Sequence, residues 1–231
     1  MKRITIYLIA LLAMYSCSKN EADLVLEPSS IQLKVGETKK IQVINNNTDV
    51  NWSVVKDYFA TVDDYGVVTG RKVGKTIAIA QSGDKKSTCK IEIIPRYNTY
   101  IEPVTEFGIT TSELIEKVGP PVKITTNSVG TTYHYNQNIS GSIKARYLFV
   151  SGLLKESLII IPWNNESREE VFNFIGERYI LMNAYPDSNL YYFMNAETIG
   201  VSTYCLELRF KNTLDGSVYN NIQVAYYRPN I

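Results

Sequence analysis

This sequence is poor in the residues from which catalytic and metal sites are usually built. His134 is the single histidine among 231 residues, and no clustered cysteines or carboxylates accompany it, so we expect no metal site. The chain also lacks a glycine-rich loop that could cradle phosphates and the glycine pattern that surrounds a nucleophilic serine. We therefore expect that the protein is not an enzyme and needs no cofactor.

An excess of charge of one sign is missing too. The net charge is +1, and lysine and arginine occur at most in pairs. Nucleic-acid binding needs a basic face that neutralises phosphates, so we exclude nucleic acid as a partner. Aromatic residues are plentiful, but they are mostly tyrosine, with 17 Tyr against 2 Trp.

The N-terminus has a short apolar run behind positive charge. Lys2 and Arg3 precede the run at residues 4–14, which is too short for a membrane-spanning helix of roughly 20 residues. This order is typical of a secretory signal peptide, and we assign residues 1–16 to it.

The end of this segment, Met14-Tyr15-Ser16-Cys17, resembles the lipobox of bacterial lipoproteins in Ser16 and Cys17, although Met14 and Tyr15 depart from its commonest form. The resemblance implies cleavage before Cys17 and acylation of its sulfur with fatty acids such as palmitate, which would anchor the chain stably. Residues 17–26 then form a polar tether, similar to that of Bacteroides-type surface lipoproteins. We expect an outer-membrane, lipid-anchored protein at the cell surface; an ordinary cleaved signal with an incidental cysteine is the alternative.

Two further cysteines fall in apolar, alternating segments of different domains. Cys89 and Cys205 would be able to pair in an oxidising compartment. We favour two separate buried thiols over this pairing, because free cysteine is usually buried.

Residues 27–95 show the two-residue alternation of half-buried strands. Ile31, Leu33 and Val35 alternate with polar Gln32 and Lys34. The predicted inward-facing residues that follow are Ile41, Val43, Val50, Trp52, Val54, Val68, Ile77, Ile79, Cys89, Ile91 and Ile93. Short strands separated by turn residues predict an all-β immunoglobulin-like sandwich.

The same segment resembles the bacterial Ig-like group 2 (BIG2) domain. The motifs that carry the resemblance lie at residues 33–38, 50–53, 60–63, 66–70 and 74–77. Such domains commonly serve as spacers or adhesive modules on surface proteins, so the resemblance implies a stalk.

After a linker at residues 96–103 the period changes. Thr110-x-x-Glu113 is a capping-box pattern, and Gly119 followed by Pro120 predicts the end of a helix. Ser167-x-x-Glu170 repeats the capping box. A shift of 57 residues places Leu114 on Val171, Ile115 on Phe172, Val118 on Ile175, Tyr135 on Tyr192 and Tyr147 on Tyr204. We therefore predict an α+β domain at residues 104–231 made of two tandem units of a helix plus antiparallel strands, 104–162 and 163–231.

The segment at residues 107–121 resembles the opening of small outer-membrane assembly lipoprotein domains. A doubled unit is similar to the β-lactamase-inhibitor-protein architecture, in which tandem units present one sheet to a protein partner. The resemblance implies a protein-binding sheet, and it does not imply inhibition of a lactamase.

The predicted binding residues are those that would lie on the face of this sheet away from the helices. Alternation predicts that Tyr133 and Tyr135 face the helices, and the repeat shift makes Leu190 and Tyr192 their counterparts. The outward set is then His134, Tyr191, Phe193 and Tyr227. The alternative is that these aromatic residues pack under a loop near residues 214–216 or against the first domain. Trp163 would stack on sugars if the ligand were a glycan.

These features predict a lipid-anchored surface binding or adhesion protein, with an Ig-like stalk that presents a protein-binding sheet to an unknown partner. Two alternatives stay open. One is a glycan-binding accessory lipoprotein, and the other is an envelope assembly or structural lipoprotein that faces the periplasm.

Overall fold

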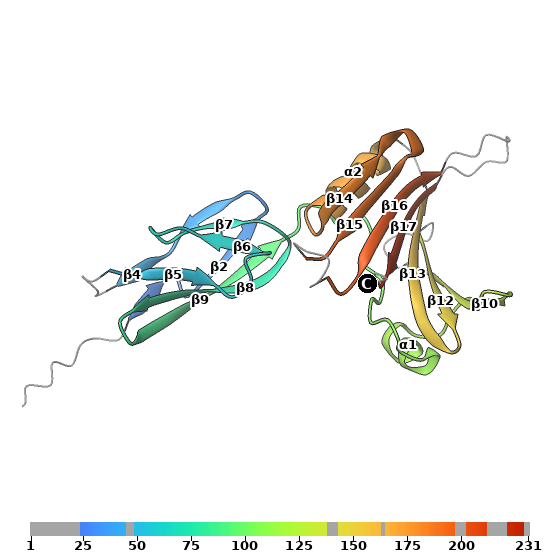
Figure 1. The fold of residues 1–231 in the computed structure, drawn as a ribbon, viewed down its shortest axis with the longest axis horizontal. Coiled ribbons are helices and arrows are strands. Elements are labelled where there is room, and N and C mark those ends of the chain that lie inside the picture. Colours follow the sequence, from blue (N-terminus) through green and yellow to red (C-terminus); the bar gives the residue numbers. More distant parts are fainter. Residues whose placement is uncertain are drawn as a thin grey trace, which may run out of the picture.

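The computed structural model describes residues 24–44, 49–137, 143–162, 165–196, 202–211 and 221–228 (Figure 1). The predictions on Cys17, the signal peptide, most of the tether and Trp163 lie outside these residues. No helix in the described ranges has the length and apolar character needed to cross a membrane.

Three small sheets form the N-terminal part, which we call the sandwich. A four-stranded sheet has the order β2-β9-β8-β5, a three-stranded sheet the order β3-β7-β6, and β1 pairs with β4. The strands are β1 (Val25–Glu27), β2 (Ser30–Lys34), β3 (Thr38–Lys40), β4 (Gln42–Ile44), β5 (Asn51–Val54), β6 (Ala60–Val62), β7 (Val67–Gly70), β8 (Gly74–Ser82) and β9 (Lys85–Ile94). One core joins the sheets, with Leu33, Val68 and Ile91 among its buried residues. This arrangement is an Ig-like β-sandwich.

The alternation predicted for the sandwich holds in most strands and is wrong in β8. Thr76, Ala78 and Ala80 are its buried residues, whereas the side chain of Ile77 is 38 % exposed. The reason is the pairing with β9, where Ala78 lies opposite buried Cys89. Residues that lie opposite one another share a face, so the inward set of β9 decides that of β8.

One glycine of the sandwich is required by its surroundings. Gly66 has φ of +77°, and a Cβ atom there would come within 2.5 Å of the carbonyl oxygen of Ile41 and 2.8 Å of the Trp52 ring. Its turn therefore tolerates no side chain, and this lets Trp52 pack beside the core.

The C-terminal part is built on an eight-stranded antiparallel sheet with the order β10-β11-β12-β13-β17-β16-β15-β14. We call it the C-terminal sheet. Its strands are β10 (Lys123–Thr126), β11 (Thr131–Asn136), β12 (Lys144–Val150), β13 (Leu153–Pro162), β14 (Ile180–Tyr185), β15 (Leu190–Met194), β16 (Cys205–Lys211) and β17 (Asn221–Tyr227). In each half one helix precedes four strands, and the last strands of the two halves, β13 and β17, pair in the middle.

The two helices begin differently. α1 (Thr111–Val118) has the predicted capping box, in which Thr110 accepts from the Glu113 backbone and the Glu113 side chain accepts from Thr110. α2 (Asn165–Gly176) begins two residues before Ser167, so the second predicted capping box is wrong. The Ser167 hydroxyl donates instead to the carbonyl of Pro162.

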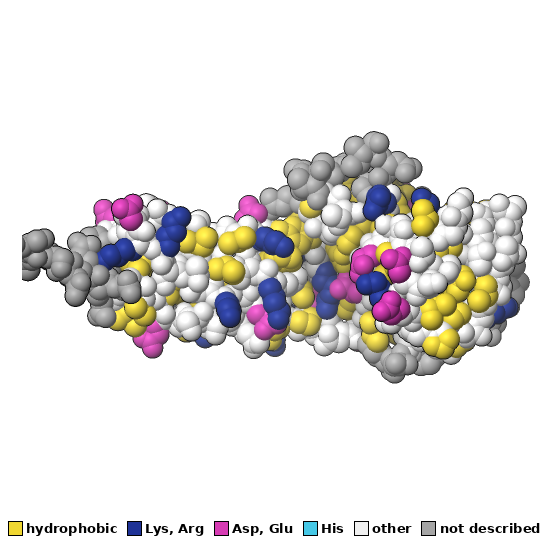
Figure 2. Space-filling view, turned by 90° about the horizontal axis from the view of Figure 1, so that it is seen from below, with side chains coloured by type: hydrophobic (Ala, Val, Ile, Leu, Met, Phe, Trp, Pro, Cys, Tyr) yellow, Lys and Arg dark blue, Asp and Glu magenta, His cyan; other side chains and the backbone are white. Residues whose placement is uncertain are grey.

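The helices also differ in how deeply they pack. α2 buries Val171, Phe174 and Ile175 against the sheet, whereas α1 buries Leu114 alone. Ile115 and Val118 remain 37 % and 39 % exposed. Figure 2, seen from the side on which α1 lies, shows hydrophobic side chains gathered at this end of the molecule.

The segment at residues 96–103, expected to be a linker, is packed into the C-terminal part. The side chain of Tyr100 is 3 % exposed, its hydroxyl lies 2.6 Å from that of Tyr226, and its ring lies 4.2 Å from the ring of Phe174. This segment thus contributes to the core under the sheet.

The sandwich and the C-terminal part are joined around Glu177, which follows α2. Its buried carboxylate accepts hydrogen bonds from the backbone N–H groups of Arg96 and Tyr97, both at 3.1 Å. From the sandwich, the N–H of Val73 donates to the Glu177 carbonyl at 2.8 Å, and the Lys72 ammonium donates to the last carbonyl of α2. The end of α2 is therefore hydrogen-bonded to the sandwich.

Candidate binding face of the C-terminal sheet

The C-terminal sheet has one face covered by the helices and one face that we call the open face. Strand pairing assigns each residue to one of the two, because directly opposite residues share a face. Side chains on the open face are half-exposed or exposed along the central strands, in contrast to the buried residues that alternate with them. They include Thr132, His134, Arg146, Leu148, Glu156, Leu158, Ala225, Tyr227, Glu207, Arg209 and Tyr192.

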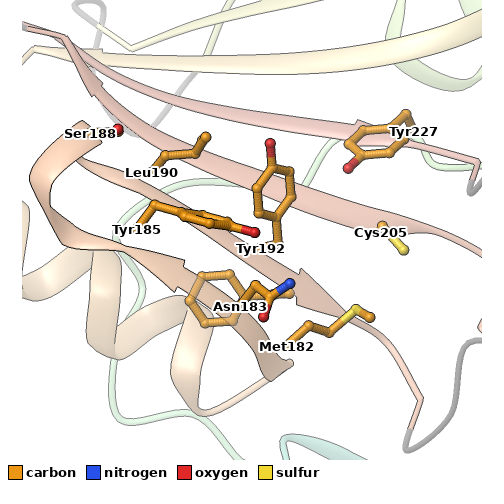
Figure 3. A pocket seen from close by; sticks show the side chains of 9 residues that line it. Met182, Asn183, Tyr185, Ser188, Leu190, Tyr192, Cys205 and Tyr227 are labelled. Carbon is orange, nitrogen blue, oxygen red and sulfur yellow. The ribbon is translucent and has the colours of Figure 1, made fainter.

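A pocket of about 630 Å³ lies on the open face of the second half (Figure 3). We call it the tyrosine pocket, and its lining includes Met182, Tyr185, Leu190, Tyr192, Cys205 and Tyr227. The Tyr185 and Tyr192 rings meet edge to face at 6.1 Å. Tyrosines on rigid strands combine apolar contact area with a polar tip, which suits a binding surface.

Two phenol groups and one thiol of this pocket have raised pKa values. Burial, the negative charge of Glu207 and a hydrogen bond with Glu207 raise the pKa of Tyr192. Burial is also the main cause that raises the pKa of Tyr227 to about 12, with Cys205 and Glu207 adding to it. Burial likewise raises the pKa of the Cys205 thiol. Tyr192, Tyr227 and Cys205 are thus held in their protonated, hydrogen-bonding forms at neutral pH.

Two carboxylates lie next to the tyrosine pocket on the open face. Glu207 forms an ion pair with Arg209 at 2.6 Å. Glu156 lies opposite Tyr227 on the neighbouring strand, and among the described residues it has no ion-pair partner. Burial, and then the charge of Glu207, raise the pKa of Glu156. The centre of the open face therefore favours a hydrogen-bond donor or a cation.

Two of the four predicted binding residues lie on the open face. Tyr227 lines the tyrosine pocket, and His134 lies on β11 in the other half of the sheet. They share the face, but β12 and β13 separate their strands.

Tyr191 and Phe193 were predicted to lie on the open face, and this is wrong. The Phe172 ring of α2 packs edge to face against both, at 5.3 Å from Tyr191 and 5.9 Å from Phe193, and the side chain of Phe193 is only 1 % exposed. Their neighbour Tyr192 takes the outward position instead.

The physical reason is a change in the repeat offset by one residue. Leu114 and Val171 are both fully buried, and 57 residues separate them. Tyr133 and Tyr191 both pack against the core, but they are 58 residues apart. Since side chains alternate along a strand, a slip of one residue exchanges the two faces. Pairing of β14 with β15 has a matching irregularity between Leu181 and Asn183, where the register shifts.

Cys89 and Cys205 are free and buried, which confirms the interpretation of two separate thiols. Within the described ranges no group of three or more His, Cys, Asp or Glu side chains is placed to hold a metal ion. The glycan-stacking role of Trp163 lies outside the described residues.

Comparison with known proteins leaves the family open. No protein-family profile and no curated protein matches the chain. Among solved structures, similar ones include an extracellular protein containing an SCP domain from Bacillus anthracis str. Ames. The two sequences are 15 % identical, the match covers 59 % of this chain and 50 % of that chain, and the TM-score is 0.28. Our chain thus spans half the length of that protein.

Two other similar structures cover more of the chain. An intimin mutant of EHEC O157:H7 is 15 % identical over 83 % of this chain and 86 % of its own, with a TM-score of 0.25. Domains 5–6 of the S-layer protein SbsC are 10 % identical over 90 % and 84 %, with a TM-score of 0.27. TM-scores this low support no argument about fold or function.

Proposed function

We propose that this chain is a lipid-anchored bacterial surface protein that binds another protein through the open face of its C-terminal sheet. The sandwich, as a BIG2-type domain, serves as the stalk. In this proposal the chain is not an enzyme. Acylation of Cys17 holds it to the outer membrane, as the lipobox-like Ser16-Cys17 supports.

The observation that carries the proposal is the tyrosine pocket. Tyr185, Tyr192 and Tyr227 line a concave surface on the side of the sheet that α1 and α2 leave uncovered. Aromatic residues, tyrosine among them, dominate the binding energy of protein interfaces when they sit in such pockets. The joint at Glu177 supports the stalk function, because Val73 and Lys72 tie the end of α2 to the sandwich there.

A photo-crosslinking experiment in intact cells tests the proposal. Ser188, which lines the pocket and is exposed, is replaced by a photo-reactive amino acid, and the adduct is identified by mass spectrometry. We expect one protein adduct that disappears when Tyr192→Ser is added. Tyr65→Ser is the control, because Tyr65 is 78 % exposed in the sandwich. An adduct that survives Tyr192→Ser would contradict the proposal.

A glycan-binding accessory function is the second candidate. Tyr185 favours it, because its ring is 50 % exposed at the pocket and is available for stacking on a sugar. Glycan-array binding that Tyr185→Ala abolishes, together with an absence of protein adducts, would support this candidate over the first.

Two measurements test the anchoring and the location. Mass spectrometry of the processed chain should find the Cys17 sulfur acylated, and an unmodified residue would remove the membrane anchor from the proposal. Protease treatment of intact cells should cleave a surface protein, whereas complete protection would indicate a periplasm-facing envelope protein.

A further inference from the structure

A single row of cross-strand neighbours crosses the open face from one edge of the sheet to the other. On β10, Lys123 lies opposite His134 of β11, which in turn lies opposite Arg146 of β12. The row continues through Leu158, Ala225, Glu207, Tyr192 and Asn183. We call Lys123, His134 and Arg146 the basic row. It lies in the first half of the sheet, and its continuation leads into the tyrosine pocket of the second half.

Two positive charges, Lys123 and Arg146, lie on either side of His134 in this row. Protonation of the His134 ring would place a third positive charge directly opposite both, and like charges directly opposite one another destabilise a sheet. Burial, then the charges of Arg146 and Lys123, lower the pKa of His134. Neither the Lys123 nor the Arg146 side chain has a hydrogen bond or an ion pair in the described part of the chain. The hydrogen bond of His134 is to the neutral hydroxyl of Thr125, at 2.8 Å. An anion at this position would pair with Lys123 and Arg146 and would favour the protonated form of His134.

A small pocket with both apolar and polar walls adjoins the basic row. It has a volume of about 220 Å³, and its apolar wall consists of Val129, Leu148 and Leu158. Arg146, Asn127 and Thr132 line it as well. Val129 is 60 % exposed in the turn between β10 and β11. Glu156 lines the pocket as well, but it forms no ion pair with Arg146 within the described ranges. A ligand that fits here therefore carries an anionic group with an aliphatic group beside it.

We infer that the basic row binds an aspartate or glutamate side chain of a protein partner, and that the adjoining pocket takes an aliphatic side chain next to that acid. This inference rests on the proposed function, because it adds the first half of the open face to a surface centred on the tyrosine pocket. Opposite charges across an interface orient the partner and reject others. Phosphate and sulfate groups would satisfy Lys123 and Arg146, but they would leave the apolar wall of the adjoining pocket without a partner.

NMR spectroscopy of the full chain, purified from membranes in detergent, tests this inference. His134 is the single histidine, so its ring signals are unambiguous. The probe is the blocked peptide acetyl-Gly-Glu-Leu-Glu-Gly-amide, and its glutamine analogue is the neutral control. We expect the glutamate peptide to shift the His134 signals and to raise its pKa, because a carboxylate favours the protonated ring. Equal responses to both peptides would overturn the inference.

Charge-removing variants locate the contact. Arg146→Gln should raise the Kd of the glutamate peptide about five-fold, as expected for one exposed ion pair of about 1 kcal/mol. Arg146→Lys, which keeps the charge, should retain most of the affinity. Lys86→Gln is the matched control, since Lys86 is exposed in the sandwich. An equal loss of affinity in Arg146→Gln and Lys86→Gln would overturn the inference. Tighter binding of a galacturonate oligomer at the same residues would overturn it as well, because it would assign the row to an acidic glycan.

The crosslinking experiment separates this inference from the proposed function. If Tyr192→Ser removes the protein adduct and Arg146→Gln leaves it unchanged, the proposed function stands and the role of the basic row is refuted. If both variants reduce the adduct, both are supported. If neither does, both fail.

Discussion

The two halves of the C-terminal sheet share one order of elements but expose different side chains. In the first half α1 is followed by β10–β13, and in the second half α2 is followed by β14–β17. The first half carries the basic row and the small pocket beside it. The second half carries the tyrosine pocket and the Glu207–Arg209 ion pair. The comparison teaches that the same order of elements positions a binding face without deciding which side chains occupy it.

The halves differ in packing as well as in surface chemistry. α2 packs three buried apolar residues against the sheet, and its last turn is hydrogen-bonded to the sandwich. α1 leaves Ile115 and Val118 partly exposed. We therefore expect the second half to contribute more to the free energy of unfolding.

Truncating equivalent helix residues should give the largest contrast. Ile175, on α2, is fully buried, and its counterpart in the repeat, Val118 on α1, is 39 % exposed. Ile175→Ala should lower the free energy of unfolding by about 2–4 kcal/mol, because it leaves a cavity. Val118→Ala should cost less than about 1 kcal/mol. Urea denaturation measures both, and equal losses would contradict the difference between the helices.

Removing the buried carboxylate at the joint should have the next largest effect. Glu177→Ala leaves the N–H groups of Arg96 and Tyr97 without their acceptor and takes a partner from Arg178. We expect a loss of about 2 kcal/mol in the free energy of unfolding. Hydrogen exchange should show faster exchange at those two amides. Glu169→Ala, at an exposed position of α2, is the control and should change neither quantity.

A pair of adjacent tyrosines tests the assignment of faces. Tyr191 packs against Phe172 of α2, so Tyr191→Ser should lower the free energy of unfolding by about 1–3 kcal/mol. Tyr192→Ser should cost less than about 1 kcal/mol, because the ring lies on the open face. Thermal denaturation compares the two. A larger loss in Tyr192→Ser would reverse the assignment and restore the original prediction.

The smallest expected effect concerns pH and the basic row. Because the pKa of His134 in the folded chain is below its ordinary value of 6.5, this group contributes stability above that value and loses it as the pH falls towards the folded pKa. Arg146→Gln removes one cause of the depression, so the pKa of His134 should rise and the loss of stability below pH 6.5 should become smaller. NMR titration of the ring measures the pKa. An unchanged value would show that Arg146 does not act on His134.

Local features of the fold followed from local sequence. Thr110 and Glu113 form their capping box because both groups lie within one turn of each other, whatever the rest of the chain does. In β9 the alternation of Cys89, Ile91 and Ile93 with polar residues identified the buried side correctly. The face of β8 was assigned wrongly, because an apolar residue, Ile77, occupies an exposed position and small Ala78 a buried one.

The candidate site was predictable only in part. His134 and Tyr227 were assigned to the open face correctly, since each alternates with residues that pack against the core. For Tyr191, Tyr192 and Phe193 alternation offers no such guide, because all three are aromatic. The repeat offset was the remaining signal, and the extra residue between α2 and β15 made it misleading.

By itself the sequence determined the alternating strands, the start of α1 and the residue types available for binding, because these depend on neighbours along the chain. Only the tertiary structure decided that Tyr192 faces outward and that Lys123, His134 and Arg146 lie side by side. The reason is that strand register is set by pairing with distant segments, and a shift of one residue moves a side chain from one face of the sheet to the other.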